Sequence, residues 1–104
     1  MATSATSTTV SDGTERPLRR NEVVELFGTP DETLGSVNEP RLRVENGVEF
    51  NEKWIYRRPS REPSRPRERI LYWQRYDFIA AIRVEQDGHL VEESPAELRA
   101  HGAE

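Results

Sequence analysis

The sequence has no cysteine, and this absence removes several functions at once. Without a thiol, the chain forms no disulfide, offers no thiolate to a metal ion, has no cysteine nucleophile and carries no lipid on cysteine. No apolar run approaches the roughly 20 residues that span a bilayer. Residues 1–10 lack the basic residue and the apolar segment of a signal peptide. We therefore expect a cytoplasmic protein without a transmembrane segment.

Side chains that carry catalysis or bind metals are also scarce. There are two histidines: His89 lies beside a predicted turn and His101 lies near the C-terminus, and neither has a dependable set of further metal ligands. Asp77 is the one acid inside an apolar stretch, and we expect it to face solvent or to make a bend. Nothing resembles a nucleophile elbow, a phosphate-binding glycine loop or a zinc motif. The sequence predicts no enzyme activity, no metal, no cofactor and no small-molecule substrate.

The chain is short and highly charged. It has 104 residues, 33% charged and 34% hydrophobic, with a net charge of −4. A folding unit of this size buries a marginal core, which suits stabilisation by a partner. We expect three parts: a disordered polar tail at 1–15, a single small domain at 16–94, and a short helix with an acidic tail at 95–104.

Helix signals occur near both ends of the chain. Asn21 is predicted to cap a helix over residues 22–27, which Gly28 ends. Residues 29–32 form a capping box with proline at the first helical position, so a single further turn is expected there, ending at Gly35. Residues 94–97 form a second capping box and predict a helix to about His101.

The middle of the chain carries strand signals. Asn46-Gly47 predicts a hairpin between residues 42–45 and 48–50, and apolar alternation over 48–56 predicts a strand. Alternation continues through 70–84, as one bent strand or as two strands with a bend at 74–77; a helix over 68–76 is a minority alternative. Asp87-Gly88 predicts a two-residue turn that sets Val84 opposite Val91 and Gln86 opposite His89. The fold class is therefore α+β: one or two short N-terminal helices packed on an antiparallel sheet of three to four strands, with a short C-terminal helix.

The two faces of these strands predict where a partner binds. The even-numbered face is expected to be mostly core, and it holds Phe50, Trp54, Tyr56, Tyr72, Tyr76, Phe78, Ile82 and Val84. The odd-numbered face is too apolar for free solvent, since it holds Ile55, Leu71, Trp73, Ile79 and Ala81. We therefore expect a contact with another protein or another subunit across Leu71, Trp73 and Ile79.

A basic run rich in proline lies between the strands, at residues 57–69. Two glutamates oppose its six arginines, which are Arg57, Arg58, Arg61, Arg65, Arg67 and Arg69. Three alternatives stay open for these arginines. They balance the acidic end of the chain at 85–104, they bind a protein partner, or they bind a polyanion such as RNA or single-stranded nucleic acid with the flanking aromatic residues.

The order of short motifs resembles a known family. Leu26-Phe27-Gly28-Thr29-Pro30, then Trp54-Ile55-Tyr56, then residues 82–91 with their Asp87-Gly88 turn resemble the small outer-membrane assembly lipoprotein family (SmpA/OmlA) and the related beta-lactamase-inhibitor-protein fold, over about residues 21–93. The resemblance implies one or two helices on an antiparallel sheet of about three strands, and a non-catalytic protein-binding role. The chain departs from the family in having no signal peptide and no lipidated cysteine, so the membrane role is not expected to carry over.

Together these patterns predict a non-catalytic protein-binding or accessory subunit. Its contacts are expected at the aromatic sheet face and at the arginine-rich loop. The alternative function is a polyanion binder that uses residues 57–69.

Overall fold

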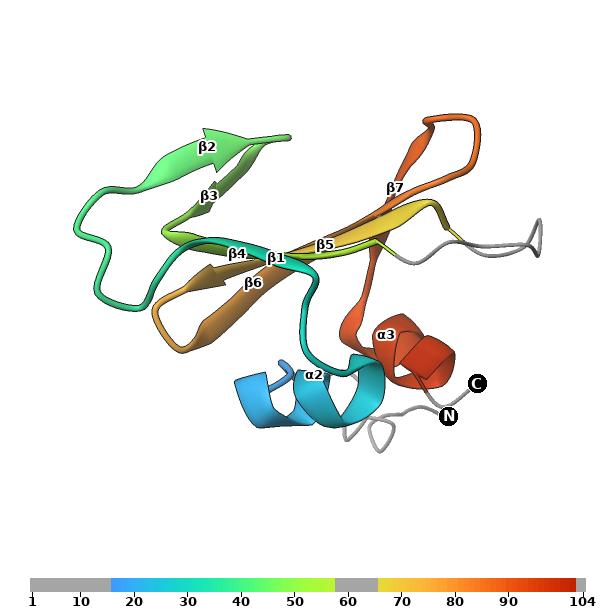
Figure 1. The fold of residues 1–104 in the computed structure, drawn as a ribbon, viewed down its shortest axis with the longest axis horizontal. Coiled ribbons are helices and arrows are strands. Elements are labelled where there is room, and N and C mark those ends of the chain that lie inside the picture. The colour runs from blue at the N-terminus through green and yellow to red at the C-terminus, as the bar shows by residue number, and fades with distance from the viewer. Residues whose placement is uncertain (1–15, 58–65, 103–104) are drawn as a thin grey trace, which may run out of the picture.

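A computed structural model describes residues 16–57 and 66–102, which form an α+β fold (Figure 1). Its elements in chain order are α2 (Arg20–Phe27), β1 (Glu32–Gly35), β2 (Arg43–Glu45), β3 (Val48–Phe50), β4 (Glu52–Tyr56), β5 (Glu68–Gln74), β6 (Asp77–Val84), β7 (Leu90–Glu93) and α3 (Pro95–Gly102). Five strands form an antiparallel sheet in the order β1-β4-β5-β6-β7, and β2 and β3 form a separate hairpin. The predicted α+β class and antiparallel pairing are confirmed, but the sheet is wider than the three to four strands expected.

The five-strand sheet has a hydrophobic core on each face. Helices α2 and α3 lie against one face, and the β2–β3 hairpin stands over part of the other (Figure 1). The core on the helix side contains Leu18, Val23, Trp54, Tyr56, Leu71, Trp73, Ala81 and Leu98. The core on the hairpin side contains Phe50, Ile55, Ile70, Tyr72, Ala80 and Ile82. Burial on both faces accounts for central strands that are apolar at even and odd positions alike.

The alternating run at 70–84 is two strands, and its even-numbered residues do not form one core face. A two-residue turn, Arg75-Tyr76, joins β5 to β6, and an extra residue, Ile79, makes a β-bulge between the pairs Tyr72↔Ala80 and Trp73↔Phe78. The β4–β5 register also pairs even with odd positions, as in Trp54↔Leu71. Tyr76 was expected in the core, but it lies in the turn and is 71% exposed.

The predicted strand over 48–56 is interrupted at Asn51. Residue Phe50 ends β3 in the hairpin, whereas Glu52 begins β4 in the sheet. Asn51 stabilises this break, because its Oδ1 accepts a hydrogen bond from the Arg75 N–H at 2.8 Å and its Nδ2 donates to the Glu39 carbonyl at 3.3 Å. The break places Phe50 in the core opposite the one that holds Trp54.

The N-terminal capping predictions are only partly correct. Helix α2 begins at Arg20, two residues earlier than predicted. Its N-cap residue, Arg19, makes no side-chain cap, so the predicted cap at Asn21 is wrong. The predicted helical turn at 29–32 is also wrong, because Glu32 starts strand β1. Pairing with β4 takes the place of the helical turn: the Asp31 N–H donates to the Ile55 carbonyl at 2.9 Å, and Glu32 lies opposite Ile55.

The predicted turn at Asn46-Gly47 is confirmed, whereas the predicted two-residue turn at Asp87-Gly88 is wrong. Asn46 and Gly47 both have positive φ, as the predicted two-residue turn requires. After β6 the loop is longer: the Gly88 N–H donates to the Glu85 carbonyl, and Val84 pairs with Leu90, not with Val91 as predicted.

The C-terminal capping box forms as predicted. The Ser94 Oγ accepts a hydrogen bond from the Glu97 N–H at 3.2 Å, and the Glu97 carboxylate accepts one from the Ser94 N–H at 2.9 Å. The second of these bonds is the main reason that the pKa of Glu97 lies below its usual value. Leu98 of this helix is fully buried, so α3 belongs to the helix-side core.

The hairpin is fastened to the sheet through a buried tyrosine. The Tyr72 hydroxyl donates to Glu45 at 2.7 Å and accepts from Asn46 at 3.1 Å. Lys53 donates to both oxygens of Glu45 at 2.9 Å. Burial, with the nearby Glu45 carboxylate, raises the pKa of Tyr72 well above its ordinary value. These bonds hold β2 and β3 in a fixed position over strands β4 and β5.

Candidate functional site

The start of α2 is anchored on the sheet by a buried ion pair. Arg20 donates to both oxygens of Glu52, at 2.7 and 3.0 Å, and Glu52 also accepts a hydrogen bond from the Trp54 indole at 2.9 Å. The Arg20 guanidinium lies over the rings of Trp54 and Trp73, 4.9 and 5.3 Å from their centroids. Glu52 is 5% exposed, so this arrangement neutralises a charge inside the helix-side core.

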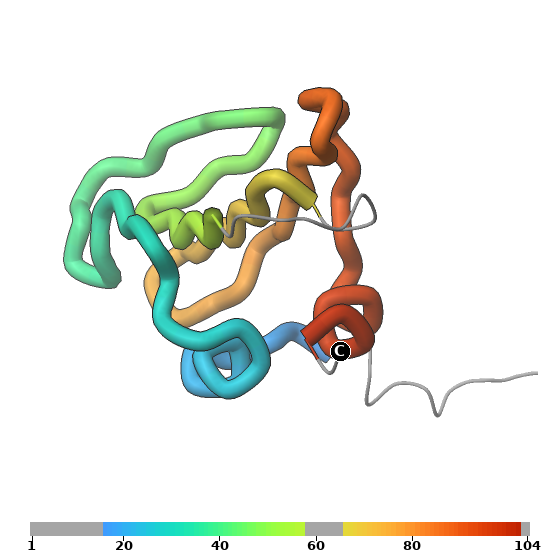
Figure 2. Tube along the Cα trace, turned by 45° about the vertical axis from the view of Figure 1, so that its right-hand side comes forward, coloured from blue at the N-terminus to red at the C-terminus, as the bar shows by residue number. Residues whose placement is uncertain are grey.

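A surface hollow lies directly beside this anchor, between the start of α2 and the β5–β6 turn. Figures 1 and 2 show these two segments next to each other. The hollow is open to solvent, and its walls are Pro17, Leu18, Arg19, Arg20, Asn21, Tyr76, Asp77 and Phe78. We call it the turn–helix hollow.

The turn–helix hollow combines an aromatic wall with an available positive charge. Tyr76 is 71% exposed, and Arg19 is exposed without an ion-pair partner among the described residues. The lining also includes the carboxylate of Asp77. An exposed aromatic ring and a guanidinium can recognise another molecule through stacking and charge.

The turn–helix hollow adjoins a stretch of β6 that has a paired strand on one edge only. Strand β7 pairs with Ala81 to Val84 of β6, so residues 77–80 pair with β5 alone in the described part of the chain. Ile79, the bulged residue of this stretch, is 39% exposed. An open strand edge next to a hollow is a geometry that can take an extended peptide segment.

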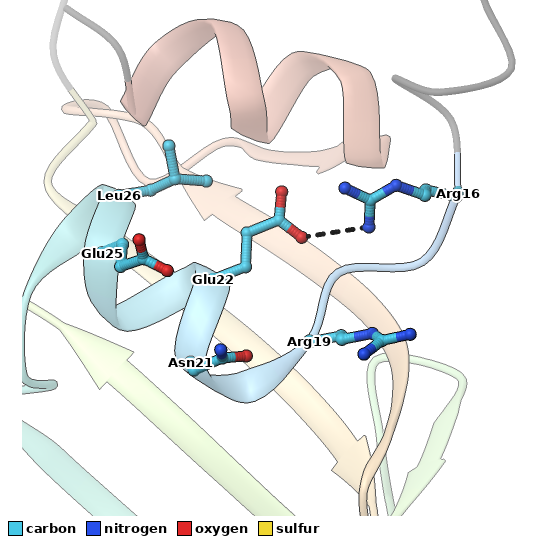
Figure 3. Close-up of a pocket in the computed structure, with 6 residues that line it drawn as sticks. All are labelled: Arg16, Arg19, Asn21, Glu22, Glu25 and Leu26. Atoms are coloured by element: carbon cyan, nitrogen blue, oxygen red, sulfur yellow. Dashed lines mark hydrogen bonds and ion pairs between the residues drawn. The ribbon is translucent and has the colours of Figure 1, made fainter.

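A second hollow along α2 contains an acid, Glu22, that already has partners within the protein. Its lining is Arg16, Arg19, Asn21, Glu22, Glu25 and Leu26, and Figure 3 shows the Arg16 and Glu22 side chains pointing toward each other. Glu22 lies 3.4 Å from Arg16 and accepts hydrogen bonds from Arg99 of α3 at 2.7 and 3.1 Å. The Arg99 hydrogen bonds lower the pKa of Glu22. This acid therefore links the two helices.

A buried acid that no sequence pattern marks lies at the other end of the sheet. Glu93 is 2% exposed, and its oxygens lie 2.7 Å from Arg69 Nε, 2.6 Å from His101 Nδ1 and 3.6 Å from Arg83 Nη1. Arg69 also lies over the Phe27 ring, 4.9 Å from its centroid. No local pattern in the sequence marks Glu93, and not its neighbour Glu92, as the acid that meets basic side chains from three other elements.

The arginines predicted as a binding loop have different locations. Arg58, Arg61 and Arg65 lie outside the described residues. Arg69 is internal, in contact with Glu93, so its predicted place on a partner-binding surface is wrong. Arg57 is half-exposed and pairs with Glu32 at 2.5 Å and Glu68 at 3.1 Å. Arg67 is exposed. Of the described arginines of this run, Arg57 and Arg69 bind acids of the protein itself, and the three alternatives for the run as a whole stay predictions.

The predicted apolar contact face is also revised. Leu71 and Trp73 are fully buried beneath the helices, so they are not accessible to a partner, contrary to the prediction. The sequence showed a surplus of apolar side chains, but it did not show that both helices cover the same face. Ile79 remains exposed, and it lies next to the turn–helix hollow.

Two residues of this hollow were missed by the sequence analysis. Tyr76 was assigned to the core, because the turn Arg75-Tyr76 lacks the glycine or asparagine that usually marks a hairpin. Arg75 takes a positive φ of 56° without either residue. Tertiary contacts stabilise it there: Arg75 Nη1 donates to the Val37 carbonyl at 2.5 Å, and Arg20 donates to the Arg75 carbonyl at 3.2 Å. Arg19 carried no distinguishing pattern.

Within residues 16–57 and 66–102, no three histidine, aspartate or glutamate side chains converge to hold a metal ion. Helices α2 and α3 are too short and too polar to cross a bilayer.

Comparison with known proteins assigns no family. A scan of protein-family models, a search of curated proteins and a search of solved structures find no match to this chain. The resemblance to the outer-membrane assembly lipoproteins stays a prediction.

Proposed function

We propose that this protein is a non-catalytic binding subunit, and that its partner is a protein which contributes an extended segment. The segment pairs with the open stretch of β6 at residues 77–80 and places a side chain in the turn–helix hollow. The observation that carries this proposal is the position of two exposed side chains beside that hollow: Ile79 lies on the part of β6 that β7 does not pair with, and Tyr76 lies in the adjoining turn.

Charge and packing make this region suitable for recognition. Arg19 offers a guanidinium to an acidic side chain of the partner, and Tyr76 offers an exposed ring to an apolar or cationic one. The platform beneath is rigid, because Arg20, Glu52 and Trp54 are bonded to one another. A preformed surface of this kind loses little entropy on binding.

Site-specific photocrosslinking tests the proposal. A photoreactive amino acid replaces Ile79 in the full chain, expressed in its own host cells. Val24 of α2 is the matched control position, because it is 40% exposed against 39% for Ile79. We expect a protein that crosslinks from position 79 and not from position 24. With that protein purified, Arg19→Glu should weaken binding roughly tenfold or more, the loss typical of a central contact.

Two results would contradict the proposal. One is the same set of crosslinked proteins from both positions. The other is unchanged affinity in both Ile79→Asp and Arg19→Glu, with circular dichroism showing that both variants fold. In that second case the purified partner binds elsewhere on the surface.

A further inference from the structure

Strand β2 is an open edge of the β2–β3 hairpin. In the described part of the chain it pairs with β3 alone, and Figure 1 shows it as the hairpin strand farther from the five-strand sheet. Its central residue, Val44, is 70% exposed, more than any other described aliphatic side chain of this size. Open edges of this kind are templates for pairing with another strand.

The turn geometry determines which main-chain groups face that open edge. Glu45 and Val48 flank the two-residue turn, so they exchange main-chain hydrogen bonds with each other. Bonded and non-bonded pairs alternate along an antiparallel ladder, so Val44, opposite Glu49, makes no such bonds to β3. The N–H and C=O groups of Val44 therefore point outward, toward the position of a further strand.

Strand β2 has a self-complementary sequence, Arg43-Val44-Glu45. We propose that a second copy of this chain pairs antiparallel with β2, with the two Val44 residues opposite each other across a two-fold axis. In that register the two Val44 residues exchange both main-chain hydrogen bonds. Arg43 of each copy then lies opposite Glu45 of the other. Opposite charges at directly facing positions stabilise a sheet.

The side chains in the present structure leave room for these contacts. Arg43 is half-buried and has no ion-pair partner among the described residues, so it is the unused cation of β2. Glu45 already binds Lys53, but its side chain is 40% exposed and a carboxylate accepts further hydrogen bonds. Both side chains lie on the same face of the hairpin, since they are two residues apart in a strand.

Neighbouring registers are disfavoured by the same charges. A two-fold axis through Arg43 sets two arginines opposite each other, and an axis through Glu45 sets two glutamates opposite each other. The register centred on Val44 is therefore the one of these three that sets no like charges opposite each other. This charge pattern favours a second copy over an unrelated strand. Because each strand contributes only three residues, the dimer should be weak and dependent on concentration.

Sedimentation velocity across a concentration series tests this proposal. We expect the average mass to rise from 12.0 kDa toward twice that value as concentration increases. Val44→Pro should abolish the rise, because it removes the outward N–H and leaves the bonds to β3 intact. Arg43→Glu should also abolish it by setting two acids opposite each other, whereas Arg43→Lys keeps the charge and should preserve the dimer.

Disulfide formation at position 44 tests the same contact without the Val44→Pro and Arg43→Glu variants. The chain has no cysteine, so Val44→Cys introduces a unique thiol. Under mild oxidation this variant should form a covalent dimer much faster than Leu90→Cys, whose parent side chain is also exposed, at 49%, but lies on β7. A mass that stays monomeric at the highest soluble concentration overturns the proposal. So does a dimer that Val44→Pro and Arg43→Glu both leave intact. Neither outcome bears on the turn–helix hollow, which lies on other elements.

Discussion

The close approach of β1 to the start of β4 gives a sharp test of the fold. Gly35 has φ of +80°, and a Cβ added there would lie 2.1 Å from the main-chain oxygen of Asn51. Asn51 cannot move aside cheaply, because its N–H donates to the Trp73 carbonyl at 3.0 Å and its side chain bonds to the main chain of Arg75 and Glu39. Gly35→Ala must therefore displace one end of β1 from β4, where four residue pairs join the two strands.

A second glycine provides the matched control. Gly47 has nearly the same φ, +78°, but a Cβ there would meet nothing within 4 Å. Both substitutions carry the cost of a left-handed backbone, about 1–2 kcal/mol. The collision of the new Cβ with the Asn51 oxygen occurs at Gly35 alone. It adds about 1–3 kcal/mol to the loss of stability, as in an overpacked core.

Urea unfolding measures the difference, with tryptophan fluorescence as the signal because Trp54 and Trp73 are both buried. We expect the free energy of unfolding of Gly35→Ala to fall about 1–3 kcal/mol further than that of Gly47→Ala. In thermal melts each kcal/mol corresponds to roughly 4–8 °C for a domain of this size. Equal losses in the two variants would refute the claimed contact between β1 and Asn51.

Three further predictions concern hydrogen bonds that hold the helices and the hairpin. Ser94→Ala should lower the free energy of unfolding by about 1 kcal/mol, measured by urea titration, because α3 loses its N-cap. The Arg99 hydrogen bonds lower the pKa of Glu22, so their stabilisation is present above the unfolded-state pKa and is lost as pH falls through the lower, folded-state value. Thermal melts from pH 7 to pH 3 should therefore show a smaller loss of stability for Glu22→Gln than for the unmodified protein. In an absorbance titration at 295 nm, Tyr72 should stay protonated well past the ordinary tyrosine pKa of about 10, and Tyr72→Phe should remove that late step.

The correct predictions were those that depend on neighbouring residues. The Asn46-Gly47 turn and the Ser94 capping box need only residues one to three positions apart, and both form. The predicted helical turn at 29–32 failed although its local pattern was as good. One turn gains little by itself, and β1 gains a full ladder with β4 from the same residues.

Prediction of the candidate site was limited for the same reason. Ile79 was named from the surplus of apolar side chains, and it is exposed beside the turn–helix hollow. Leu71 and Trp73 carried the same pattern, but the helices cover them. Tyr76 was missed because contacts to Asn51 and Val37 stabilise the turn at Arg75, and these partners are distant in sequence.

The sequence alone determined the α+β class, the antiparallel strands, the positions of two turns and the helix at 95–102, because these follow from alternation, capping and turn residues. Tertiary structure alone decided whether the even- or the odd-numbered residues of each strand face the helix-side core. It also decided which acids are buried with arginine, and which stretch of strand keeps an unpaired edge. Those outcomes depend on register across the sheet. A single bulge at Ile79 or a break at Asn51 moves every following side chain to the other face.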